Sequence, residues 1–168
     1  MIRRNSEILW LPSNLLIDHV YSDALKNDPD ETGGMLLGYV NREHRVITAL
    51  VDAGPKAVRS SYFMKPDDIY QQQKLQEHFE LTEGRETYIG EWHSHPNSPP
   101  EMSKTDRKTL HRVTIKATNL PALPVMVILG SSDGVGFSKI RAYRRNSRDH
   151  LFLGLRAQHF SEMLIKTY

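Results

Sequence analysis

The sequence predicts an α/β fold in which a mixed central sheet is flanked by helices. Strand-like apolar runs and segments of helical period interleave along the chain. Some neighbouring strand-like runs are joined by short turns, so antiparallel hairpins are expected beside parallel crossovers. Glycine and proline fall singly or in pairs between these segments, and no linker or repeat interrupts them. We therefore expect residues 1–168 to form a single domain.

The first part of the chain predicts a strand, a helix and a hairpin. After an apolar strand at 8–11, Pro12 and Ser13 open a helix that ends before Asn27. The apolar residues of this helix recur at near-helical spacing, as Leu16, Val20 and Leu25. Two β-rich runs joined by a polar turn follow, at 35–40 and 46–51.

Two further helices and three strands are expected in the rest of the chain. Pro66-Asp67-Asp68 is a helix N-terminal signal, and this helix continues to about Leu81 and stops at Gly84. The apolar face of Leu110, Val113 and Ala117 predicts a third helix at 103–118. The expected strands lie at 87–95, 124–129 and 137–143. From about Asn146 the pattern is ambiguous, and 151–153 fits either an edge strand or the start of a helix.

Charge and cysteine content exclude several classes of function. Twenty-two Lys+Arg against 20 Asp+Glu leave a formal net charge of +2, too balanced for a protein that coats a polyanion, so a nucleic-acid partner is not expected. The chain has no cysteine, which excludes a cysteine nucleophile and thiolate metal ligands. No apolar run approaches the roughly 18 residues of a membrane span, and none forms a signal segment, so we expect a cytoplasmic protein.

The stretch Gly-Glu-Trp-His-Ser-His-Pro at 90–96 carries the side chains best suited to chemistry. Residues two apart on a strand project from the same face, so His93 and His95 can point at one place near the end of the predicted strand. Asp106 lies in the first turn of the next helix, from which its carboxylate can reach back to the histidines. Two imidazoles and one carboxylate suit a zinc ion whose fourth position is left to water, which is a catalytic arrangement.

Each part of this set has a simpler interpretation when taken alone. A His-x-His pair arises by chance in a chain with eight histidines, and Ser103-x-x-Asp106 is also a helix-capping pattern. The combination of the two at this spacing favours metal binding. Glu91 shares the face of the histidines, where it either orients a ligand imidazole or forms a structural salt bridge.

Hydrolysis at such a site also needs a general base, and Glu31 is the candidate. It follows the first predicted helix and precedes Gly33, Gly34 and a strand, so it can lie beside the metal. An acid ahead of two glycines also fits an ordinary solvated loop.

Together these motifs resemble the signature of the JAMM/MPN+ (Mov34/JAB) zinc metallopeptidases. The resemblance rests on Glu31 before Gly-Gly-x-Leu-x-Gly, then His93-x-His95, seven residues, and Ser103-x-x-Asp106. It implies an MPN/JAB fold, which is cytidine-deaminase-like, with His93, His95 and Asp106 as zinc ligands. It further implies that Glu31 is the proton shuttle and that Ser103 donates a hydrogen bond to the oxyanion formed when hydroxide attacks a carbonyl.

The residues of the motif are most similar to those of the small bacterial branch of this family, in particular the deconjugating isopeptidase of CBASS anti-phage operons. That resemblance implies a zinc-dependent isopeptidase or peptidase. Its expected substrate is the amide at the C-terminus of a ubiquitin-like modifier, or of a cGAS-like nucleotidyltransferase, conjugated to target proteins. Two alternatives stay open: a processing peptidase for a ubiquitin-like or sulfur-carrier protein, and a non-catalytic MPN scaffold.

Overall fold

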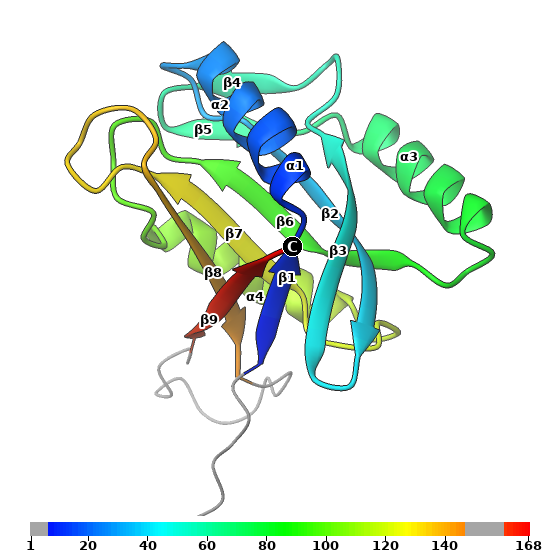
Figure 1. The fold of residues 1–168 in the computed structure, drawn as a ribbon. Helices are drawn as coiled ribbons and strands as arrows, with labels where there is room; N and C mark the ends of the chain where they lie inside the picture. The colour runs from blue at the N-terminus through cyan, green and yellow to red at the C-terminus, as the bar shows by residue number, and fades with distance from the viewer. Residues whose placement is uncertain (1–6, 147–159) are drawn as a thin grey trace, which may run out of the picture.

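A computed structural model describes residues 7–146 and 160–168, and Figure 1 shows how the elements are arranged. The strands are β1 (Ile8–Leu11), β2 (Gly33–Asn41), β3 (His44–Asp52), β4 (Val58–Ser60), β5 (Phe63–Lys65), β6 (Thr87–Ser94), β7 (Val125–Gly130), β8 (Lys139–Arg145) and β9 (Phe160–Thr167). An N-terminal helix comprises α1 (Ser13–Leu15), the π-helical turn η1 (Leu16–Tyr21) and α2 (Ser22–Asn27). Two longer helices follow it, α3 (Asp68–Leu81) and α4 (Lys104–Lys116).

Most of the strands form one mixed sheet that curls into a closed barrel in the order β1-β3-β2-β6-β7-β8-β9. Its ends meet where β1 pairs in parallel with β9. The β1–β3 and β6–β7 pairs are also parallel, whereas the remaining neighbours are antiparallel. Strands β4 and β5 form a separate antiparallel hairpin. The α/β class with a mixed central sheet is therefore confirmed, and the closure of the sheet adds to it.

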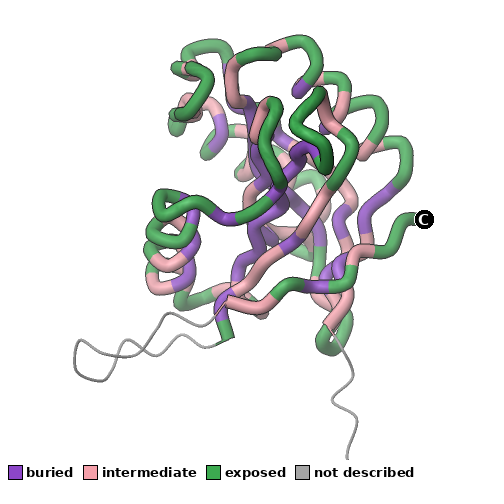
Figure 2. The backbone as a smooth tube through the Cα atoms, turned by 90° about the vertical axis from the view of Figure 1, so that its left-hand side faces the viewer, coloured by how far each residue is buried: buried purple, intermediate pink, exposed green. Residues whose placement is uncertain are grey.

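The core is divided between the two faces of this sheet. The odd-numbered residues of β7 belong to the largest apolar cluster, which also holds Val20 and Ala24 of the N-terminal helix. The even-numbered residues Met126 and Ile128 face the other way and pack with Leu110 of α4. A third cluster lies where α3 covers β2 and β3. Figure 2 shows the buried residues gathered in the interior of the molecule, with exposed residues in its outer segments.

Capping residues explain why the two longer helices begin where the sequence predicts. The Asp67 side chain accepts a hydrogen bond from the Tyr70 amide at the start of α3, and Ser103 caps α4 in the same way through the Asp106 amide. Helix α3 ends at Leu81, as predicted, and α4 ends at Lys116, two residues before the predicted end.

The strands differ from the sequence prediction in several places, and the bounds of β2, β3, β6 and β7 shift by one or two residues. The hairpin β4–β5 was not expected, and β8 begins at Lys139, two residues after the predicted start. Gly134 and Gly136 have positive φ angles, which keep the preceding segment in a turn conformation. The ambiguous segment 151–153 lies outside the described residues, while β9 follows at Phe160–Thr167. Among the described residues, no helix is long and apolar enough to cross a membrane.

Candidate metal centre

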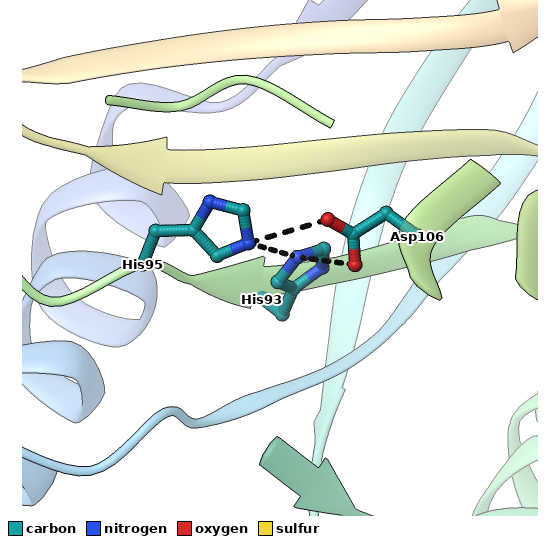
Figure 3. Close-up of side chains that lie close together, drawn as sticks. All are labelled: His93, His95 and Asp106. Atoms are coloured by element: carbon teal, nitrogen blue, oxygen red, sulfur yellow. Dashed lines mark hydrogen bonds and ion pairs between the residues drawn. The ribbon is translucent and has the colours of Figure 1, made fainter. Parts of the chain in front are cut away.

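His93 and His95 meet at the end of β6, where that strand lies between β2 and β7. Their Nε2 atoms are 2.9 Å apart, and the rings are tilted against each other with centroids 4.7 Å apart. His93 is 9% exposed. The two-residue spacing thus places both imidazoles on one side of the strand, as the sequence predicts. Figure 3 shows the rings converging with the Asp106 carboxylate.

Asp106 reaches this point from the first turn of α4. Its Oδ1 lies 3.2 Å from His93 Nε2, and its Oδ2 lies 3.4 Å from His95 Nε2. The same carboxylate accepts a hydrogen bond from the Ser103 amide at 2.7 Å, while Ser103 Oγ accepts one from the Asp106 amide at 3.1 Å. This capping box fixes the carboxylate in place. Asp106 therefore takes part in capping α4 and also lies against the two histidines.

The donor atoms of His93, His95 and Asp106 fit a divalent cation. One ligand atom from each residue lies within 4.8 Å of the others. Burial alone would raise the pKa of Asp106, but the two histidines outweigh it and hold that pKa well below its usual range. Burial alone would lower the pKa of His95, yet hydrogen bonding to the Asp106 carboxylate raises it. The carboxylate is therefore ionised at neutral pH. Together with the two imidazoles it supplies the oxygen and nitrogen donors that zinc accepts.

Glu31 lies on the loop before β2, close to this cluster. The antiparallel register pairs Gly33 with His93, and the Ser94 amide donates to the Thr32 carbonyl at 2.8 Å. Extending this register by one residue beyond the Thr32–Ser94 pair places Glu31 opposite His95, on the same face of the sheet. Burial raises the pKa of the half-buried Glu31 carboxyl, while the charges of His93 and His95 lower it. The structure thus places this predicted base within electrostatic reach of the histidines.

Ser103 and Glu91 border the cluster. Ser103 is exposed at the start of α4, and its oxygen is engaged as the helix cap. Glu91 lies in β6, accepts a hydrogen bond from the Tyr88 hydroxyl at 3.2 Å, and has its pKa raised by burial. The part played by Glu91 stays a prediction, because the partner seen for its carboxylate is a tyrosine rather than a histidine.

The sequence analysis missed two residues that hold these groups together, Ser94 and Thr32. Ser94 lies between the two histidines and Thr32 follows Glu31, and both are fully buried. Alternation along the strands was the available signal, because neighbours of residues on one face must point to the other.

Comparisons with known proteins identify the family and the fold. A model of the family described as prokaryotic homologs of the JAB domain matches residues 13–146. A probable metalloprotease of Sinorhizobium fredii, y4qB, is 32% identical over 125 residues, which cover 73% of this chain and 76% of that protein. A CD-NTase/cGAS isopeptidase of Escherichia coli is 32% identical over 103 residues, which cover 61% of this chain and 64% of that protein. The solution structure of protein DSY2949 from Desulfitobacterium hafniense has the same fold, with a TM-score of 0.62 and 14% identity over 96% of this chain and 92% of that chain.

Proposed function

The chain belongs to the family of prokaryotic JAB-domain homologues and is a metalloprotease of the JAMM type, and we propose that it is a zinc-dependent isopeptidase acting on protein conjugates. Its substrate would be the amide that joins a cGAS-like nucleotidyltransferase, or a ubiquitin-like modifier, through its C-terminus to a target protein. The observation that carries the proposal is the convergence of His93, His95 and Asp106. Relatives named CD-NTase/cGAS isopeptidase support the choice of substrate.

His93, His95 and Asp106 would hold the zinc ion, since their donor atoms already converge. When bound, zinc supplies Lewis-acid chemistry and lowers the pKa of water to about 7, so that a nucleophile is available at neutral pH. The capping box on Asp106 and the hydrogen bond between His95 Nδ1 and the Pro99 carbonyl (3.3 Å) would orient two of the ligands.

Glu31 would move the proton during amide hydrolysis. The attacking water loses a proton to the Glu31 carboxylate as the new carbon–oxygen bond forms. The carbon–nitrogen bond then breaks, and Glu31 returns the proton to the leaving amine. Burial of Glu31 favours this role, because a carboxyl pKa raised toward neutrality makes both transfers easier.

Ser103 would stabilise the oxyanion that develops on the substrate carbonyl. Its oxygen accepts the Asp106 amide, which leaves the hydroxyl hydrogen free to be donated to another acceptor. Because the side chain is exposed at the helix start, a substrate carbonyl can approach it.

The test combines metal analysis with cleavage of defined conjugates. Purified protein reconstituted with zinc is expected to hold about one zinc per chain and to release a cGAS-like nucleotidyltransferase from an amide conjugate. Glu31→Gln should retain the zinc and lose cleavage, while Glu80→Gln, an exposed change on α3, serves as the matched control. Absence of zinc after reconstitution would contradict the metal site. Zinc binding without cleavage of any conjugate would instead favour a scaffold, and preference for a linear precursor would favour a processing peptidase.

A further inference from the structure

Glu31 lies on a connection that has no regular structure of its own, between α2 and β2. Its amide donates to the Ser60 carbonyl of β4 at 2.8 Å. On the other side, the next residue, Thr32, is bonded to β6 through Ser94. The Ser94 hydroxyl oxygen accepts the Thr32 amide at 3.0 Å, and the Ser94 amide donates to the Thr32 carbonyl at 2.8 Å. The place of Glu31 therefore depends on bonds to neighbouring elements.

The hydroxyl of Thr32 links the charged side chains of Asp23 and Arg59 through two hydrogen bonds, which together form a relay. Its hydroxyl donates to Asp23 Oδ2 of α2 at 2.7 Å and accepts from Arg59 Nε of β4 at 3.2 Å. The direction of both bonds is fixed, because a carboxylate can only accept a hydrogen bond and a guanidinium can only donate one. Charge-assisted hydrogen bonds of this kind are stronger than bonds between neutral groups.

This relay lies on the face of the sheet opposite the metal cluster. Consecutive residues of an extended chain point to opposite sides, so Thr32 and Ser94 face away while Glu31 and His95 face the cluster. Thr32 and Ser94 are 0% exposed, so both side chains are shielded from solvent, whereas Asp23 and Arg59 are half-buried. The hydroxyl can therefore affect Glu31 only through the backbone. The metal ligands come from β6 and α4, and the bonds between Thr32 and β6 use the Thr32 backbone rather than its hydroxyl.

We propose that Thr32 is a positioning residue whose hydroxyl ties α2 and the β4–β5 hairpin to the backbone of Glu31, and so holds that carboxylate in its working position. The inference rests on the proposed role of Glu31 as the proton carrier. It makes the hairpin part of the support of the active site, because Arg59 and Ser60 of β4 hold two successive residues.

Two substitutions at Thr32 separate positioning from packing. Thr32→Val keeps the shape but removes both side-chain hydrogen bonds, whereas Thr32→Ser keeps both bonds and removes only the methyl group. A displacement of the base by about 1 Å can cost on the order of 100-fold in rate, so Thr32→Val is expected to lower kcat by about 10- to 100-fold. KM and zinc content should change little, and Thr32→Ser should retain most of the activity. Equal losses in both variants, or an undiminished kcat in Thr32→Val, would overturn the proposal.

Hydrogen exchange provides a readout that does not require a known substrate. In Thr32→Val, the amides in 28–34 and 57–66 and the amide of Ser94, which donates to the Thr32 carbonyl, should exchange about tenfold faster, with no change elsewhere and none in Thr32→Ser. If Thr32→Val does not fold, Arg59→Ala removes one partner from the hairpin, and Lys65→Ala, an exposed change on the same hairpin, is its control. Faster exchange only in Arg59→Ala supports the relay, and unchanged exchange overturns it. If the unmodified protein cleaves no conjugate, the proposed function fails, while the exchange result still decides whether the relay holds Glu31.

Discussion

The Oδ2 atom of Asp106 accepts a hydrogen bond from the Ser103 amide at 2.7 Å and also lies 3.4 Å from His95 Nε2. One carboxylate thus closes the N-terminus of α4 and completes the candidate metal site. Its two tasks respond differently to substitution. An amide can replace a carboxylate as a hydrogen-bond acceptor, but it does not carry the negative charge that a cation requires.

Asp106→Asn should therefore separate capping from metal binding. We expect zinc affinity to fall by at least about 10-fold, while the stability of the metal-free protein to denaturant falls less than in Asp106→Ala. The alanine variant also loses the hydrogen bond from the Ser103 amide to the side chain at position 106, which lowers the free energy of unfolding by roughly 1 kcal/mol. Competition titration with a chromophoric chelator and urea unfolding measure the two effects. Equal zinc affinity in Asp106→Asn and the unmodified protein would remove Asp106 from the ligand set.

Ser103→Ala should reduce stability slightly and activity strongly. The helix loses its N-cap, worth about 1 kcal/mol, while loss of an oxyanion donor costs on the order of 100-fold in kcat. Ser103→Thr keeps a hydroxyl for both purposes and is the control. Urea unfolding and steady-state kinetics on the same samples measure both effects. A loss of stability with unchanged kcat would leave Ser103 as a helix cap alone.

The pH dependence of the metal-free protein follows from the interaction between His95 and Asp106. Since Asp106 raises the pKa of His95 in the folded state, His95 contributes stability that is present below its ordinary pKa of about 6.5 and is lost as the pH rises through the raised value. The lowered pKa of Asp106 has the opposite effect on the pH dependence of stability. Asp106 contributes stability that is present above its ordinary pKa of about 4 and is lost as the pH falls.

Unfolding of the metal-free protein should accordingly become easier as the pH rises above the ordinary histidine pKa of about 6.5, whereas zinc affinity should increase in the same direction. The increase in affinity arises because zinc must displace the proton that the pair retains. Urea unfolding and zinc titration at several pH values test both trends. In Asp106→Asn the alkaline loss of stability should shrink, and a slope equal to that of the unmodified protein would show that another group is responsible.

How much of this arrangement can be predicted from the sequence depends on how local its causes are. The period of two in β6 places His93 and His95 together, and the Ser103 cap places Asp106 in the first turn of a helix. Both relationships act over a few residues, so they can be predicted. The hairpin β4–β5 has three-residue strands, too short to show a period.

The supports of Glu31 are distant in the sequence and so could not be predicted. Thr32 bonds to Asp23, nine residues away, to Arg59, 27 residues away, and to Ser94, 62 residues away. These contacts exist only once α2, β4 and β6 have come together in the folded chain. Strand β9 is a similar case, because few of its residues are buried and it shows little apolar alternation.

Two adjacent glycines offer the sharpest test of how backbone packing sets the metal site. A methyl group on Gly33 would collide with the Trp92 carbonyl and press on His93 Cα, whereas one on Gly34 would collide with the Val51 carbonyl of β3. Both Gly33→Ala and Gly34→Ala should destabilise the protein by about 1–3 kcal/mol, because backbone atoms must move. Only Gly33→Ala displaces the strand that carries His93, so only this variant should also weaken zinc binding. Urea unfolding and zinc titration of the pair provide the measurement, with Gly34→Ala as the matched control. If the two variants bind zinc equally well, contact between Gly33 and β6 does not set the position of His93.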